Sequence, residues 1–83
     1  MKFTYITSGV CSRSIEIEIE NDRVVNVKYL GGCNGNLQGI SALVKGLPID
    51  EVIEKLENIR CGFKNTSCPA QLALALKEYK EKN

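Results

Sequence analysis

The hydrophobic pattern of the chain changes its period once, near Gly31, and this change constrains the fold more than any other feature. Before Gly31 the period is two, which is typical of strands with one buried face. After Gly31 the period is near 3.6, which is typical of amphipathic helices. Strands that precede helices in this way predict an α+β fold, in which helices cover one face of an antiparallel sheet.

Three strands are expected before Gly31. The first covers residues 2–7, and the second alternates three isoleucines with three glutamates: Ile15, Ile17, Ile19 and Glu16, Glu18, Glu20. The third covers residues 24–30, after a turn at Asn21 and Asp22. A two-residue turn would place Ile19 opposite Val24. We prefer a three-residue loop, which keeps the isoleucines on one face with Val25, Val27 and Tyr29, because a slip by one residue would expose them to water.

Three helical stripes follow. The first comprises Leu37, Ile40, Leu43 and Val44, and its helix ends at Gly46. The second comprises Ile49, Val52, Ile53 and Leu56, with Pro48 in the first turn. The third comprises Leu72, Ala75, Leu76 and Tyr79, with Pro69 at the first helical position and Gln71 as a capping-box partner. Leu74 lies off the last stripe and is a candidate contact with another chain. We therefore predict one domain over residues 1–83, a three-stranded antiparallel sheet followed by three helices packed on one face.

Composition narrows the function classes. The chain has 83 residues, a net charge of +1, four cysteines and no histidine. No basic cluster favours nucleic acid or a membrane surface, and neither a signal peptide nor a membrane span is predicted. A cytoplasmic location is therefore expected, where four cysteines favour metal or redox chemistry over disulfides. A domain this small also gains from a staple such as a bound metal.

All four cysteines fall in connections rather than on hydrophobic stripes. Cys11 links the first two strands, Cys33 precedes the first helix, Cys61 lies in the loop before the last helix, and Cys68 begins that helix. Helix N-termini stabilise thiolates, and four thiolates suit tetrahedral zinc or an iron–sulfur cluster. No Cys-x-x-Cys motif supports the site. Buried unliganded cysteines, a disulfide and a redox-active cysteine pair are the alternatives.

Two other patterns have simpler explanations. The three glutamates are the solvated face of a strand rather than paired acid–base catalysts. Gly31-Gly32-Cys33-Asn34-Gly35 lacks the Gly-Lys-Ser/Thr ending of a phosphate-binding loop. Without a histidine base or a cofactor fingerprint, the chain is not expected to be an enzyme on its own.

Thr66-Ser67-Cys68-Pro69 resembles the start of the Thr-Ser-Cys-Pro-Asp signature of the TSCPD domain family, with Ala70 in place of the aspartate. The whole chain is similar to a small stand-alone, four-cysteine branch of that family. Related domains occur at the C-terminal end of cobalamin-dependent ribonucleotide reductases. The resemblance therefore implies an accessory or regulatory partner of ribonucleotide reductase, with ribonucleoside-diphosphate reductase activity only by association.

A looser resemblance, to the U-type iron–sulfur scaffold proteins (the IscU/NifU family), covers most of the chain. Cys11 before a long strand, Tyr29-Leu30-Gly31-Gly32-Cys33-Asn34-Gly35, the segment 44–51 and Cys68 at a helix start look like that family's features. This resemblance implies a similar fold, three ligands at Cys11, Cys33 and Cys68, and a cysteine desulfurase as a partner. The scaffold's histidine is Ser67 here and its aspartate is absent after Cys11. Cys61 is then the candidate fourth ligand of a closed site.

Overall fold

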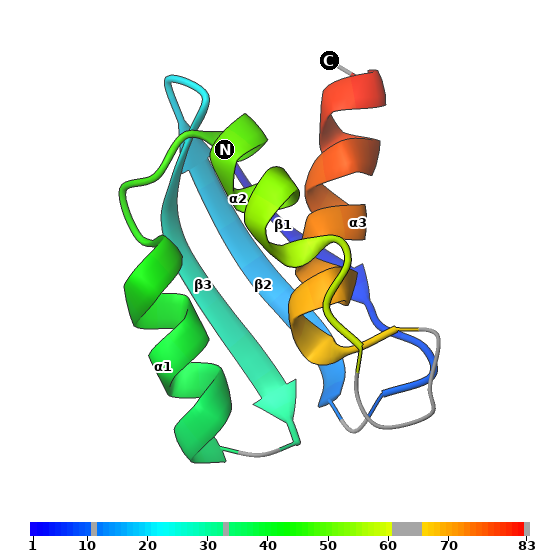
Figure 1. Cartoon of the computed structure of the whole chain (residues 1–83). Helices are drawn as coiled ribbons and strands as arrows, with labels where there is room; N and C mark the ends of the chain where they lie inside the picture. The colour runs from blue at the N-terminus through cyan, green and yellow to red at the C-terminus, as the bar shows by residue number, and fades with distance from the viewer. Residues whose placement is uncertain (11, 33, 61–65, 83) are drawn as a thin grey trace.

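The computed structural model describes residues 1–10, 12–32, 34–60 and 66–82. Within them, three strands precede three helices: β1 (Lys2–Ile6), β2 (Ser12–Glu20), β3 (Arg23–Gly31), α1 (Asn34–Val44), α2 (Ile49–Leu56) and α3 (Cys68–Lys82). Figure 1 shows the sheet with its helices and both chain ends. The predicted α+β fold is confirmed. None of the helices described is long and apolar enough to cross a membrane.

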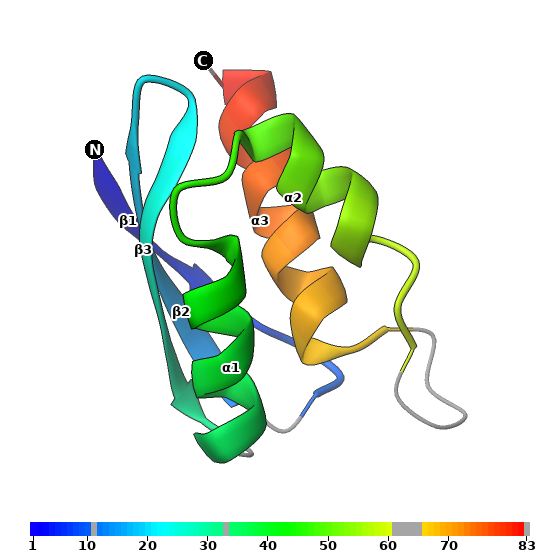
Figure 2. The same cartoon turned by 60° about the vertical axis from the view of Figure 1, so that its left-hand side comes forward.

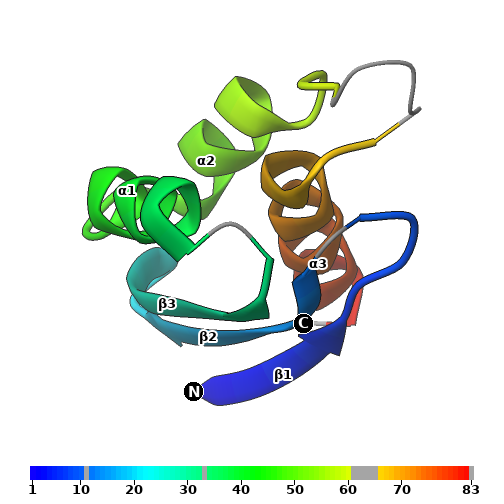
Figure 3. The same ribbon diagram turned by 90° about the horizontal axis from the view of Figure 1, so that it is seen from below.

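The sheet is antiparallel, with the strands in sequence order. All three helices lie on the same side of it, which Figure 2 and Figure 3 show from two further directions. The isoleucines of β2 face the helices and are buried. The largest fully buried side chains form the centre of the core: Ile15, Ile17, Val24, Val52, Leu72 and Leu76. The strand glutamates lie outside this core, as their alternation predicts.

The expected three-residue loop between β2 and β3 is wrong. Asn21 and Asp22 form a two-residue turn with φ values of 54° and 61°, and Ile19 pairs with Val24. Two left-handed residues match the natural twist of a tight hairpin. A bulge follows, because Glu18 pairs with Asn26 and leaves Val25 as the extra residue. Beyond the bulge the expected pairs are restored, from Glu18 with Asn26 to Ser14 with Leu30, so the isoleucines stay buried although the turn is shorter. The prediction that Val25 joins them is wrong, because the short turn puts Val24 in the core instead.

Helix α1 covers β3 with a narrower stripe than expected. Leu37 and Val44 are buried and Ile40 packs against the core, whereas Leu43 is 78% exposed. The prediction that Leu43 belongs to the buried stripe is wrong. A helix lying over an edge strand needs only one row of contacts, so Leu43 is left outside it. The predicted end of the helix is correct: Gly46 has φ of 87° and donates its backbone N–H to Val24 O.

Helix α3 begins differently from the expected capping box. Ser67 Oγ accepts a hydrogen bond from Ala70 N at 3.1 Å, so Ser67 is the capping side chain. Gln71 does not close a box; its side-chain amide instead contacts Ser8 and Thr66. Helix α2 begins after Pro48, which occupies the N-cap rather than the first turn. These differences leave the positions of the helices as the sequence predicts.

Candidate metal centre

Cys68 is the first residue of α3 and is 8% exposed. Its place follows from the local sequence, because Ser67 caps the helix and Pro69 suits the first turn. The N–H groups of the first turn and the positive end of the helix stabilise negative charge on sulfur. The position is therefore suited to a thiolate.

Ser12, at the start of β2, contacts Cys68 directly. Its Oγ lies 3.2 Å from Cys68 Sγ, and both residues are buried. The Thr7 hydroxyl donates a hydrogen bond of 2.7 Å to the Ser12 carbonyl, which fixes the backbone that carries this serine. The first residue of one strand is thus held against the first residue of the last helix.

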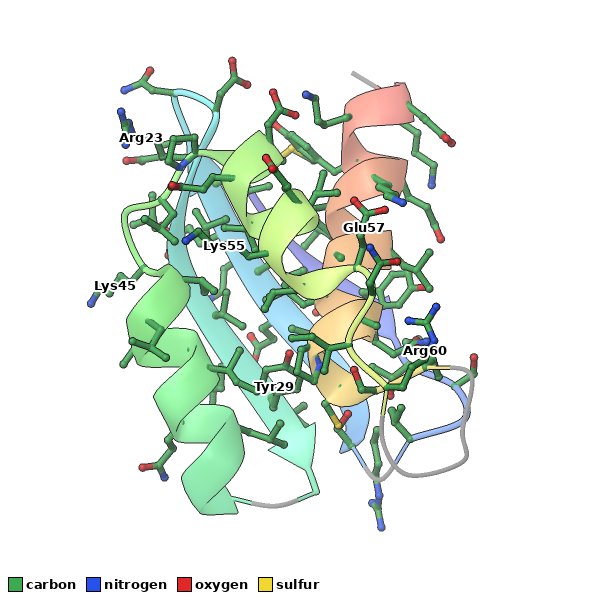
Figure 4. All side chains as sticks on the ribbon, viewed as in Figure 1. Arg23, Tyr29, Lys45, Lys55, Glu57 and Arg60 are labelled. Carbon is green, nitrogen blue, oxygen red and sulfur yellow. The ribbon has the colours of Figure 1, made fainter. Side chains whose placement is uncertain are left out.

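Tyr29 reaches the same helix start from β3. Its hydroxyl donates to Cys68 O at 2.9 Å, and Figure 4 shows its ring beside the beginning of α3. Burial, followed by the nearby Cys68 thiol, raises the pKa of Tyr29 well above its ordinary value. Tyr29 therefore remains a neutral hydrogen-bond donor over the physiological range.

Three of the four predicted ligands, Cys11, Cys33 and Cys61, lie outside the described residues. Their described neighbours are linked around the fourth, Cys68. Ser12, which follows Cys11, is the strand partner of Gly31, which stands two places before Cys33. Ile59, two places before Cys61, accepts a hydrogen bond of 2.7 Å at its carbonyl from Ser67 Oγ. The structure thus brings together residues next to or two places from each predicted ligand.

A second set of contacts ties the link between β1 and β2 to the segment before α3. Gln71, which is 3% exposed, accepts from Ser8 N at 3.2 Å and donates to Thr66 Oγ1 at 3.1 Å. Gly9 has φ of 71°, and a Cβ there would lie 3.5 Å from the Thr66 methyl group. Sequence reasoning missed the roles of Ser12, Tyr29 and Gln71. The sequence carried a signal for Gln71 alone, because the helical period places this polar side chain beside buried residues.

Carboxylates are absent from the segments that meet here. Every Asp and Glu of the chain falls within residues 16–22, 50–57 or 78–81. The three segments that supply the contacts around Cys68, residues 1–15, 23–49 and 58–77, contain none. Arg13 and Arg60 are exposed at this end, and Figure 4 shows Arg60 close to the start of α3. A thiolate at Cys68 would therefore meet no carboxylate from these three segments.

A hollow of about 490 Å³ opens between β3 and α1, beside Gly31 and Gly32. Its polar lining includes Lys28, Gln38 and Ser41 but no carboxylate. No three Asp, Glu or Cys side chains cluster anywhere in the part of the chain that the structure describes.

Fold and contacts together define a small α+β domain with a buried thiol at the start of its last helix. The chain belongs to the TSCPD domain family, whose model matches residues 1–80. No curated protein and no solved structure matches the chain.

Proposed function

We propose that the protein is a small metal-binding module in which Cys11, Cys33, Cys61 and Cys68 hold zinc or an iron–sulfur cluster as thiolates. One observation supports the proposal: described neighbours of Cys11 and Cys61 contact the start of α3, where Cys68 lies, and Gly31, two places before Cys33, pairs with one of them, Ser12. Consecutive Cα atoms are about 3.8 Å apart, so the proposal requires each segment to turn toward the start of α3 over only one or two residues.

Electrostatics supports the same assignment. Four thiolates on one divalent ion leave a net negative charge, which is costly beside carboxylates and favourable beside cations. The segments at this end carry Arg13 and Arg60 and no acid. The N-terminus of α3 adds positive partial charge at Cys68. The donor set fits zinc and a four-ligand cluster alike.

The metal would supply structural cross-linking to a small hydrophobic core, and a cluster would add electron transfer. The protein's own residues would contribute the geometry. Tyr29 and Ser67 fix the backbone at the start of α3, and Thr7 fixes Ser12. A permanent, closed site is the form we favour, with Cys61 as the fourth ligand. A labile carrier that uses Cys11, Cys33 and Cys68 is the alternative.

The test is metal analysis of protein purified without oxygen, together with its visible spectrum. Stoichiometric zinc in a colourless protein, or iron and sulfide in a coloured one, is the expected result. Refolding with Co²⁺ under reducing conditions provides an independent check, since thiolate–cobalt charge transfer is coloured. A protein that holds none of these metals after both treatments would contradict the proposal.

A second role is favoured by two exposed side chains. Ile6 and Leu30 are 73% and 42% exposed, and both pair with Ser14 on the outer face of the sheet, close to the start of β2. We infer that this surface serves an accessory role toward a larger enzyme, for which ribonucleotide reductase is the candidate. Sedimentation of the chain mixed with a cobalamin-dependent reductase tests this. Co-sedimentation that Ile6→Asp abolishes supports the role, and separate sedimentation refutes it.

A further inference from the structure

Ser12 stands out because its hydroxyl has an unusual partner for a residue at the start of a strand. It is 4% exposed, and its Oγ lies 3.2 Å from Cys68 Sγ, across a sequence separation of 56 residues. The Thr7 hydroxyl already occupies the Ser12 carbonyl. The serine side chain is therefore held in a defined position rather than rotating in solvent.

The direction of this hydrogen bond depends on the state of the sulfur. When Cys68 is a thiol, either atom can donate. A thiolate has no proton, so the serine hydroxyl must then be the donor. Hydrogen bonds to an ionised acceptor are stronger than neutral ones. Formation of the thiolate therefore selects one direction and strengthens the contact.

We propose that Ser12 is a positioning residue for the metal centre, whose hydroxyl donates to the Cys68 thiolate and sets both its orientation and its electron density. This inference rests on the proposed function, because it assumes that Cys68 binds the metal. Groups that hydrogen-bond to a ligand typically change metal affinity by about 10- to 100-fold. Hydrogen bonds to the sulfurs also set the reduction potential of a cluster.

Geometry explains why Ser12 and not a neighbour has this role. Ser14 lies on the same strand but pairs with Ile6 and Leu30 on the outer face. The register shift between Ser12 and Ser14 separates the two faces, so Ser12 is turned toward α3. Tyr29 also contacts Cys68, where its hydroxyl donates to the carbonyl oxygen. Ser12 thus supplies a hydroxyl within hydrogen-bonding distance of this sulfur.

The experiment compares cobalt-loaded wild type, Ser12→Ala, Ser12→Thr and Ser14→Ala. Loss of a donor raises the energy of the sulfur electrons, so the sulfur-to-cobalt charge-transfer band of Ser12→Ala should move to longer wavelength. Its cobalt affinity, measured by chelator competition, should fall about 10- to 100-fold. Ser12→Thr retains the hydroxyl and should resemble wild type. Ser14→Ala is the matched control and should leave the band in place.

Different failures have different meanings. Wild type that shows no thiolate–cobalt band overturns the proposed metal site and this inference with it. Wild type that binds cobalt, with an identical band in Ser12→Ala, overturns only the role of Ser12. Should Ser12→Ala not fold, Ser12→Val and Ser12→Thr provide the same comparison with matched shapes. A band shifted in Ser12→Val but not in Ser12→Thr supports the hydroxyl, and equal bands in the two variants contradict it.

Discussion

The hydroxyl of Tyr29 donates a hydrogen bond to the backbone carbonyl of Cys68, across 39 residues of sequence. It connects the third strand to the first residue of the last helix at 2.9 Å. We expect Tyr29→Phe to lower the free energy of unfolding by about 1 kcal/mol, the usual net contribution of one hydrogen bond. Urea denaturation of metal-free protein measures it. Leu74→Ala, on the exposed side of α3, is the control, and an equal loss in both variants would contradict the assignment.

The same tyrosine predicts a loss of stability in alkali. Burial, and then Cys68, raise the pKa of Tyr29 in the folded protein, whereas a tyrosine in the unfolded chain ionises near pH 10. The contribution of Tyr29 to the free energy of unfolding is therefore complete below about pH 10 and is lost as the pH rises above it. The difference in unfolding free energy between wild type and Tyr29→Phe should shrink above that pH. A difference that grows with pH would show that folding lowers the pKa of Tyr29 rather than raising it.

Gln71 is expected to be more important for stability than its polarity suggests. It is buried and connects Ser8 N and Thr66 Oγ1. Gln71→Met keeps the volume but leaves both partners without this bond, which should cost about 1–3 kcal/mol. Thermal unfolding is the measurement. A midpoint within error of wild type would mean that water replaces the amide without cost.

Metal loading should stabilise the fold and depend on pH. Protons compete with metal for thiolates, so binding weakens on acidification. We expect a chelator to lower the thermal unfolding midpoint of the loaded protein, and the loaded protein to lose this extra stability as the pH falls. Calorimetry with and without chelator tests it. An unchanged midpoint in a protein shown to contain metal would rule out a structural role.

Cys61 distinguishes a closed site from a labile carrier. In a closed site Cys61→Ser removes one of four equivalent ligands, and a structural zinc site contributes on the order of 10 kcal/mol. Chelator competition should then show similar, large losses of affinity for Cys61→Ser and Cys33→Ser. If Cys61→Ser binds normally while Cys33→Ser does not, the three-cysteine carrier is the correct description.

Periodicity predicted most of the fold because burial of one face determines it. The isoleucines of β2 are buried as their spacing requires, and so are Leu72, Ala75 and Leu76 of α3, while Tyr79 is partly buried against the core. Periodicity could not predict the bulge at Val25, since a short turn with a bulge and a longer turn without one bury the same isoleucines and differ in whether Val24 or Val25 joins them. Periodicity also placed Leu43 on the buried face of α1, although this side chain is exposed. A pattern within one helix carries no information on the width of the surface that the helix covers.

The candidate site was predictable to a smaller extent. Residue type and position suggested Cys68 at a helix start, and the structure places it there. The contact with Ser12 depends on how a strand start meets a helix start far along the chain. Local sequence does not encode that approach, and serine is common enough that its presence gave no signal.

If the chain binds metal as we propose, the uneven distribution of carboxylates would make surface potential a reporter of metal loading. Arg13 and Arg60 are exposed, and the segments that carry them, residues 1–15 and 58–77, contain no Asp or Glu. Four thiolates around a divalent ion would add negative charge there and reduce that local field. Empty and loaded molecules would then differ in electrophoretic mobility and in attraction to polyanions, while their folds remain alike. A binding partner could thus distinguish the two forms at long range, before any contact with the cysteines is made.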